Sequence, residues 1–248
     1  MSSASGTDKW KADDDFEEYR KAHPGADYSK FYTTRTAAMV RTGRQHNSLG
    51  NNIVTDGVSD FWETGAKQAQ RLMRLGDVQP SYRVVEYGCG SLRMAGHFMK
   101  LLEPSNFFGL DVIADFYEQG RANVGTELLE KARPRLAVIS EESVAEAAAF
   151  QADFVFAHSV VIHVHPDILP KMFQNMARIA SKPGARLAFN AMLHEPPVRY
   201  ANLGWAWPEA YFMEHFRDFG LHKIERGKVV DKGGYQIGGA MFVFQRTR

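Results

Sequence analysis

Short apolar runs alternate with longer amphipathic stretches from Tyr82 to the end of the chain. The runs are rich in β-branched and aromatic residues, which favour strands; they are YRVVEY (82–87), NFFGLD (106–111), RLAVI (135–139), ADFVFAH (152–158) and ARLAFNAML (185–193). Apolar residues at helical spacing between them predict helices over 91–102, 113–132, 141–150 and 166–180. This alternation is typical of a mainly parallel sheet with helices on both faces.

Two more apolar runs close the chain, LHKIERGKVV (221–230) and GGAMFVFQR (238–246). The link between them contains glycine, which predicts an antiparallel hairpin at one edge of the sheet. We therefore expect an α/β core over residues 81–248, with a seven-stranded, mainly parallel sheet and an antiparallel C-terminal hairpin.

Residues 1–80 have a helical pattern without the strands. Helices are predicted around Phe16 and Tyr19, from Thr33 to Val40, and after Ser59, where apolar residues recur at helical spacing as far as Gly76. The first eight residues predict a flexible tail, and RTGRQHNSLGNN (41–52) predicts a loop. We interpret residues 1–80 as a helical cap with a lid segment.

Composition removes several classes of protein. The 248 residues carry 30 basic and 29 acidic side chains, whereas nucleic-acid-binding domains are usually strongly basic. No apolar run approaches the about 18 residues of a membrane-spanning helix, and the acidic N-terminal segment is unlike a secretory signal. We expect a soluble, cytoplasmic protein with no nucleic-acid or membrane partner.

A glycine turn lies where the first strand meets the first helix of the core, in VVEYGCGS (84–91). Gly88 and Gly90 allow a sharp turn and a close approach of a ligand to the main chain. The free N–H groups of the following helix favour polar ligands. Asp111 ends the second strand about twenty residues later, where a carboxylate can accept hydrogen bonds from a ribose diol.

The residues around this turn indicate which nucleoside it suits. A dinucleotide fingerprint has a third glycine beside the pyrophosphate, and Arg93 occupies that position. Glu86 lies two residues before Gly88, and an acid there suits a ligand that carries an amino group. Both residues favour an amino-acid nucleoside over the dinucleotide of an NAD-linked oxidoreductase, which is the first alternative.

These segments resemble class I S-adenosylmethionine-dependent methyltransferases of the small-molecule type. VVEYGCGSLRMA (84–95) resembles motif I, FFGLDV (107–112) the second motif, and ADFVFAHSVVIHV (152–164) with SKPGARLAFNAM (181–192) the fourth and fifth strands. The Pro-Pro-aromatic box of many enzymes that methylate DNA or RNA amino groups is absent from the fourth strand. The resemblance implies a Rossmann-like fold and S-adenosyl-L-methionine as the cofactor.

Carried over position by position, the resemblance implies a cofactor site formed by Glu86, Gly88, Cys89, Gly90, Ser91, Asp111, Val112, Ser140, Glu141, His158 and Ser159. Glu86 would face the methionine amino group, Asp111 the ribose, and Val112 the adenine. We interpret Cys89 as a small buried side chain beside the ligand. The family's common third glycine is Leu92 here, which leaves the contour of the loop open.

Histidines supply the candidate bases, because a hydroxyl acceptor usually needs its proton removed. His163 follows the fourth strand and His194 the fifth, and we predict His163 or His194 as the catalytic residue. A structural role for either is the alternative. His158, His163 and His165 lack an obvious acidic partner set for a metal, so we expect no metal site.

Seven aromatic residues occur between positions 200 and 219, against about two expected from the 12% average. Tyr200, Trp205 and Trp207 are predicted to line an acceptor pocket in an insert at about 193–212. Phe212, Phe216 and Phe219 fit a helix and are assigned to the core. The alternative is a hydrophobic plug or a contact face for a second copy of the chain, which leaves a homodimer open.

The sequence therefore predicts S-adenosylmethionine-dependent methyl transfer to a small-molecule acceptor, with oxygen slightly favoured over nitrogen. A binding module without catalysis and a protein or RNA methyltransferase remain as alternatives.

Overall fold

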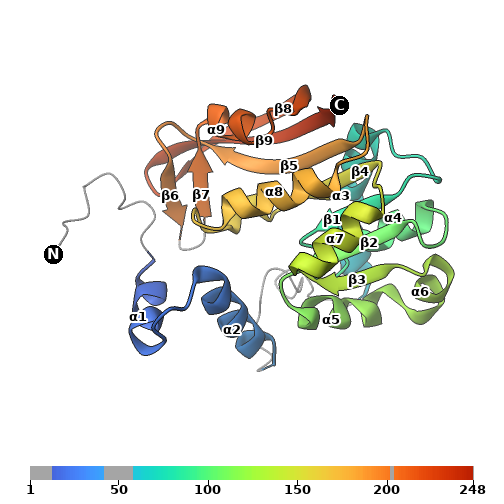
Figure 1. The fold of residues 1–248 in the computed structure, drawn as a ribbon, viewed down its shortest axis with the longest axis horizontal. Coiled ribbons are helices and arrows are strands. Elements are labelled where there is room, and N and C mark those ends of the chain that lie inside the picture. The colour runs from blue at the N-terminus through green and yellow to red at the C-terminus, as the bar shows by residue number, and fades with distance from the viewer. Residues whose placement is uncertain (1–12, 42–57, 202–203, 248) are drawn as a thin grey trace.

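The computed structural model describes residues 13–41, 58–201 and 204–247 (Figure 1). The helices are α1 (Asp14–Ala22), α2 (Tyr28–Arg41), α3 (Val58–Gly76), α4 (Ala95–Leu101), α5 (Ala114–Val124), α6 (Thr126–Ala132), α7 (Glu141–Ala149), α8 (Leu169–Ile179) and α9 (Glu209–His215), with a 3-10 turn η3 (Val161–His163). The strands are β1 (Val84–Tyr87), β2 (Phe107–Asp111), β3 (Arg135–Val138), β4 (Phe154–Ala157), β5 (Arg186–Leu193), β6 (Val198–Ala201), β7 (Gly204–Trp207), β8 (Phe219–Lys232) and β9 (Tyr235–Arg246).

The first five strands form a parallel sheet in the order β3-β2-β1-β4-β5. Strand β9 pairs antiparallel with β5, and β8 pairs antiparallel with β9. The predicted α/β core and C-terminal hairpin are thus both present. Because β1 lies between β2 and β4, the carboxyl ends of these three strands meet at one edge, as ligand sites in this kind of sheet require.

One hairpin was not predicted. Residues of the predicted insert form β6 and β7, and β7 continues the sheet by pairing with the end of β5 through Met192 and Leu193. Gly204 begins β7, and a Cβ there would lie 2.8 Å from ring atoms of Tyr200. All four residues of β7 are buried, so packing in the core explains this strand, and the sheet has nine strands instead of seven.

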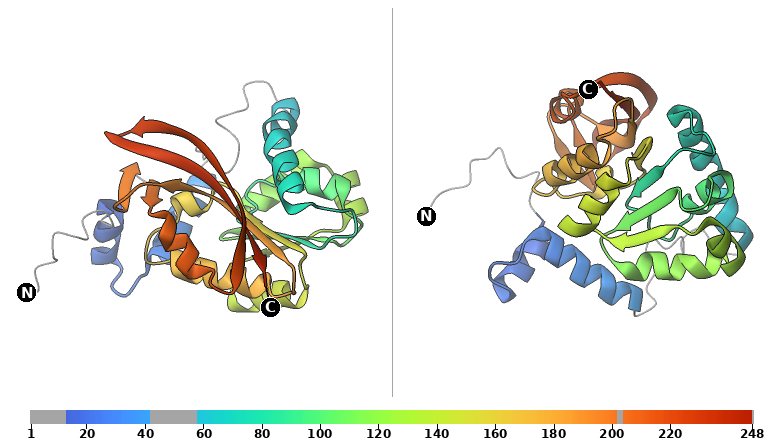
Figure 2. Two further views of the ribbon diagram at one scale, coloured as in Figure 1. Left: turned by 90° about the horizontal axis from the view of Figure 1, so that it is seen from above. Right: turned by 45° about the vertical axis from the view of Figure 1, so that its right-hand side comes forward.

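Side chains of successive strand residues point to opposite faces of the sheet, and each face has its own core. Val84 packs with residues of α3 and α4, such as Leu72 and Phe98. Val85 packs on the other face with residues of α8, such as Phe173. Figure 2 shows the helices on both faces and the long β8–β9 hairpin that extends beyond them.

The helix predicted over 113–132 is interrupted. Gly125 has a φ of 89°, a conformation that side chains disfavour, and it separates α5 from α6. The helix predicted from residue 91 begins at Ala95, because the preceding residues continue the glycine turn. In the described part of the chain, no helix combines the length and the apolarity needed to cross a membrane.

The predicted cap divides into two parts. α3 belongs to the core, where Ala69 and Leu72 are fully buried. α1 and α2 form a separate small cluster with Phe16, Tyr28 and Phe31, beside the edge at which the parallel strands end (Figure 1). The predicted tail, and the predicted lid segment beyond Arg41, lie outside the described residues.

Four buried side chains and the partly buried Arg199 join α1 and α2 to the rest of the molecule, and we call them the cap latch: Asp13, Tyr28, His165, Arg199 and Trp205. Asp13 is 4% exposed, accepts a hydrogen bond from the Tyr28 hydroxyl at 2.9 Å, and lies 3.6 Å from Arg199 in an ion pair. The Tyr28 ring stacks on His165 with centroids 4.1 Å apart, and the edge of His165 meets Trp205 at 5.6 Å.

Candidate functional site

The structure defines the backbone conformation of the glycine turn after β1, which the sequence alone did not determine. Gly88 and Gly90 have positive φ angles of 85° and 50°, and Leu92 follows with 61°. Leucine therefore adopts the conformation that a glycine would adopt there, at a cost of about 1–2 kcal/mol. Its side chain is fully buried, which contributes about 1.5–3 kcal/mol and offsets that cost.

Two further glycines let helices touch the turn directly. A Cβ on Gly120 of α5 would lie 2.3 Å from the Ser91 carbonyl oxygen, and a Cβ on Gly65 of α3 would lie 2.5 Å from the Arg93 carbonyl oxygen. The N–H groups of Gly88 and Cys89 both donate to the Leu110 carbonyl, at 2.7 and 3.0 Å. The turn is thus fixed by backbone contacts with β2, α3 and α5.

Asp111 ends β2 beside this turn and is 5% exposed. One carboxylate oxygen accepts from the Gly90 N–H and the other from the Val112 N–H, each at 2.7 Å. Burial raises the pKa of Asp111 to about 6, and these backbone hydrogen bonds oppose the rise. Each carboxylate oxygen can accept a second hydrogen bond. Asp111 therefore keeps the capacity for the ribose contact that the resemblance implies.

Glu86 lies on β1 and is 1% exposed. Its Oε2 atom has no hydrogen-bond partner within the described ranges. Burial and the nearby Asp111 raise the pKa of Glu86 well above its usual value, and Arg93 opposes the rise. A buried carboxyl oxygen without a donor is costly. A ligand that brings an ammonium group would supply that donor, so the site fits the cofactor implied by the sequence.

Polar residues continue from Glu86 along the ends of β4 and β5. Burial, Arg93 and Arg71 together lower the pKa of His158 to about 4, so its imidazole is neutral at pH 7. The Ser159 hydroxyl lies 3.2 Å from His158 Nδ1, and the Ser159 N–H donates to Asn190 Oδ1 at 2.6 Å. Ser159 has a φ of 58°, which is uncommon outside glycine.

Sequence reasoning missed Asn190. The signal was available, because asparagine interrupts the apolar run of β5 in RLAFNAML. A polar residue in a largely apolar strand needs a hydrogen-bond partner, and Asn190 finds it in the Ser159 N–H, which it holds in place.

The turn residues Cys89 and Ser91 are both buried at 4% exposure. Burial, followed by Asp111 and Glu86, raises the pKa of the Cys89 thiol well above its usual value. A protonated thiol is a poor nucleophile. This environment agrees with the interpretation of Cys89 as a small packing residue.

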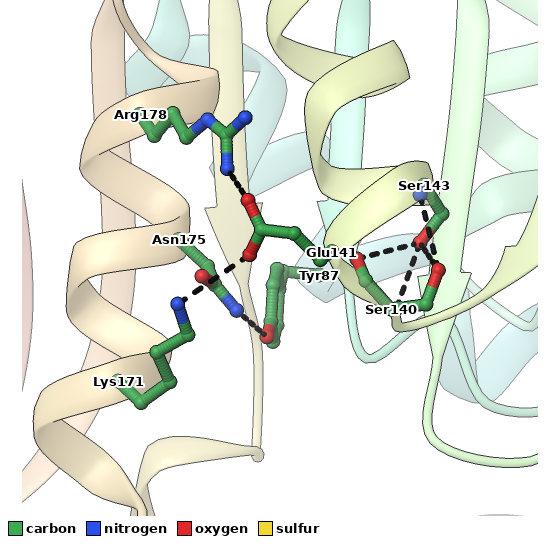
Figure 3. Close-up of polar contacts among 7 residues, drawn as sticks. All are labelled: Tyr87, Ser140, Glu141, Ser143, Lys171, Asn175 and Arg178. Carbon is green, nitrogen blue, oxygen red and sulfur yellow. Dashed lines mark hydrogen bonds and ion pairs between the residues drawn. The ribbon is translucent and has the colours of Figure 1, made fainter.

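Ser140 and Glu141 have structural partners of their own (Figure 3). Ser140 caps α7 by accepting from the Ser143 N–H at 3.1 Å. The Glu141 side chain turns to α8, where it pairs with Arg178 and Lys171. The adenine contact of these two residues stays a prediction, with the main chain around Ser140 better placed for it than the carboxylate.

The two candidate bases come from different elements. His163 ends η3 and is exposed. His194 follows β5, and its Nδ1 donates to the Pro196 carbonyl at 2.8 Å. That bond leaves the lone pair of the neutral ring on Nε2, the form a base needs. His165 lies in the cap latch instead. Among the described residues, no group of three potential ligands is placed to hold a metal.

The predicted acceptor residues are more buried than a pocket lining would be. Trp205 is fully buried and Trp207 is 4% exposed. Trp207 stacks on Tyr211 at 4.2 Å, and Trp205 lies beneath Arg199 in the cap latch. Tyr200 is partly buried, with Lys232 5.1 Å from its ring centre. The acceptor role of these three residues stays a prediction.

Phe212, Phe216 and Phe219 are buried in the core, as predicted. Two surface hollows of about 380 and 450 Å³ lie away from the turn: the first beside Arg83 and Arg135, the second beside α5 and α6. Neither includes a predicted site residue.

None of the protein-family models searched matches the chain, and no curated protein does. Solved structures do match. Magnesium protoporphyrin IX methyltransferase (ChlM) from Synechocystis PCC 6803 with bound SAM is 15% identical, with 90% of this chain and 100% of that chain covered and a TM-score of 0.60.

N-methyltransferase NodS from Bradyrhizobium japonicum WM9 is 12% identical, covers 73% of this chain and 87% of its own, and has a TM-score of 0.52. The [4+2]-cyclase SpnF is 13% identical, covers 73% and 81%, and has a TM-score of 0.57. The chain has the fold of class I S-adenosylmethionine-dependent methyltransferases, as its sequence predicts.

Proposed function

We propose that the chain binds S-adenosyl-L-methionine and transfers its methyl group to a small-molecule acceptor, with oxygen slightly favoured over nitrogen. The observation that carries the proposal is the pair of buried carboxyl groups beside the glycine turn, Glu86 and Asp111, of which Glu86 Oε2 lacks a donor in the described part of the chain. A ligand with an ammonium group and a ribose diol complements both.

The electrostatics of this pair disfavour a dinucleotide. Burial and the nearby Asp111 already raise the pKa of Glu86, and a pyrophosphate beside the pair would add negative charge. Arg93 is the nearby cation, and burial lowers its pKa while Glu86 opposes that change. The balance supports a cationic amino-acid nucleoside.

The remaining residues of the turn would hold the ligand with their main chain. Gly88 and Gly90 lack a Cβ, and at Gly88 a Cβ would lie 2.4 Å from the Val160 side chain, so the backbone of the turn packs closely there. Val112 follows Asp111 and is half-buried, which suits contact with the flat adenine ring. His158 and Ser159 would close the site from β4.

When bound, the cofactor supplies a methyl group on a sulfonium. The neutral thioether that leaves needs no protonation. The chain's task is then to position the acceptor atom in line and to accept its proton as the bond to carbon forms. For a hydroxyl acceptor that proton would pass to a neutral histidine. His163 and His194 remain the candidates, and the bond from His194 Nδ1 to Pro196 supports the correct tautomer.

The name of one matching structure supports a small acceptor. It is a magnesium protoporphyrin IX methyltransferase, and the match covers 90% of this chain and 100% of that chain. The second is an N-methyltransferase. Because the fold includes a protein named as an N-methyltransferase, it does not exclude nitrogen as the acceptor atom. Tyr200, Trp205 and Trp207 would contribute an apolar wall to the acceptor space.

The alternative is a chain that binds the cofactor without transferring its methyl group. The similarity to a [4+2]-cyclase favours this alternative, because that protein shows the same fold with another named activity. A protein or RNA acceptor gains no support from the near-zero net charge.

Calorimetry with S-adenosylhomocysteine tests the binding step. Because the pKa of Glu86 is raised in the free protein, contact with an ammonium group should release up to about one proton, and affinity should rise with pH through that pKa. Titrations in two buffers of different ionisation enthalpy measure the release. Glu86→Gln should abolish it, whereas Glu225→Gln, in an ion pair with Arg71, should not.

Turnover is tested separately, by the appearance of S-adenosylhomocysteine from the methyl donor when pools of small hydroxyl and amine compounds are added. Binding without turnover for any pool would favour the non-catalytic alternative. Failure to bind either form of the cofactor would refute the proposal as a whole.

A further inference from the structure

One face of α2 carries four residues at intervals of four: Tyr28, Tyr32, Thr36 and Val40. Residues at this spacing lie above one another on a helix. Tyr28, Thr36 and Val40 are 4%, 3% and 5% exposed, and Tyr32 is partly buried. This face of α2 is therefore turned towards the rest of the protein along its whole length.

The N-terminal end of α2 is held near β4. Tyr28 stacks on His165 in the cap latch, and His165 belongs to the connection between β4 and α8. Phe31 packs in the same cluster with Ile168 of that connection.

The other end is fixed near β2. Val40 packs with Ile113 and Phe116, which begin α5 directly after Asp111. α2 therefore contacts α5 where α5 begins. Because β1 lies between β2 and β4 in the sheet, a helix anchored at both neighbours must cross in front of the carboxyl end of β1, where the glycine turn is. Figures 1 and 2 show α2 on this side of the sheet.

The two middle residues, Tyr32 and Thr36, are polar, and hydrogen bonding by Thr36 lowers the pKa of Tyr32. Burial, followed by the charge of Asp111, raises the pKa of Tyr32 to about 12, so its hydroxyl stays protonated at neutral pH. Tyr32 therefore offers a hydroxyl group within the electrostatic reach of Asp111, from the opposite side of the strand ends. Thr36 is 3% exposed, and a buried hydroxyl needs a polar partner, which the Tyr32 phenol one turn earlier can supply.

We propose that α2 forms the roof of the cofactor site and that Tyr32, oriented by Thr36, hydrogen-bonds the ribose diol of the bound nucleoside opposite Asp111. This inference rests on the proposed function. Each ribose hydroxyl can donate one hydrogen bond and accept others, so an acceptor carboxylate on one side and a phenol on the other complement the diol. A nucleoside that lacks the diol would lose both contacts.

The test compares two ligands that share the ribose and differ in the amino acid, S-adenosylhomocysteine and methylthioadenosine. Tyr32→Phe should weaken both by the same factor, about fivefold, because it removes one hydrogen bond to the shared part. Thr36→Val should weaken both by less. Tyr19→Phe, on the neighbouring helix α1, is the matched control and should change neither affinity.

The outcomes separate the inference from the function on which it rests. Unchanged affinity in Tyr32→Phe, with the wild-type protein binding both ligands, would overturn the inference alone. A loss confined to S-adenosylhomocysteine would place Tyr32 at the amino-acid part and also overturn it. A fall in the melting temperature of the ligand-free protein with no fall in affinity would assign Tyr32 a structural role. Absence of binding by the wild-type protein would refute the proposed function itself.

Discussion

The glycine turn and the β6–β7 hairpin lie at the same edge of the sheet and are built in opposite ways. The turn is defined by missing side chains: Gly65, Gly88 and Gly120 bring backbone to within about van der Waals contact of its neighbours. The hairpin is defined by large side chains, with Trp205 and Trp207 almost fully buried. The first region brings backbone into close contact with its neighbours, and the second packs aromatic rings into the core.

This difference determines how well each region can be interpreted. Glycine at a strand–helix turn has few purposes, so its presence indicates a ligand or a close backbone contact. Tryptophan packs equally well against a substrate or against the protein's own core. Trp207 meets Tyr211, and Trp205 meets His165, so the described contacts of both rings are with the protein itself.

The largest expected effect is on kcat, and it should come from substitution of His163. If His163 is the base, His163→Ala should lower kcat by about 10²–10⁴ while cofactor affinity is unchanged. Its exposure predicts little loss of stability, which thermal unfolding checks. Full activity in this variant would transfer the assignment to His194, whose own alanine variant should then show the loss.

A substitution in α5 should weaken cofactor binding and leave the β6–β7 hairpin unchanged. Gly120→Ala would place a methyl group 2.3 Å from the Ser91 carbonyl oxygen, which is backbone and cannot move aside without shifting the turn. We expect S-adenosylhomocysteine affinity to fall, and kcat to fall by about 100-fold, because a misplacement of about 1 Å can cost that factor in rate. Gly220→Ala, where the nearest atom is a flexible Thr247 methyl at 3.4 Å, should leave the affinity intact.

The smallest expected effect is on the acceptor KM, and it tests whether the β6–β7 hairpin contributes to acceptor binding. Trp207→Phe keeps an aromatic ring against Tyr211, so the fold should survive. If the indole lines the acceptor space, acceptor KM should rise by about threefold to tenfold, or about 0.7–1.4 kcal/mol, with cofactor affinity unchanged. A lower melting temperature with an unaltered KM would assign Trp207 to the core and remove it from the acceptor site.

The sheet and the glycine turn could be predicted from the sequence because short apolar runs and glycine–acid spacing reflect local requirements of the backbone. The loop contour at Leu92 could not, since no residue pattern shows that a buried leucine will accept a positive φ. The β6–β7 hairpin could not either, because its pairing with the end of β5 is a long-range contact. The position of Tyr32 depends on anchors at His165 and Ile113, which are far from it in the sequence.

The cap latch has a practical consequence for anyone who shortens this protein. Removing the residues before α2 would delete Asp13 and Phe16, and with them the partner of Tyr28 and of Arg199. His165 and Trp205 would then lose part of the cover that keeps them from water. Newly exposed aromatic surface promotes self-association. A trimmed protein should therefore precipitate more readily than the full chain, and solubility trials should retain α1.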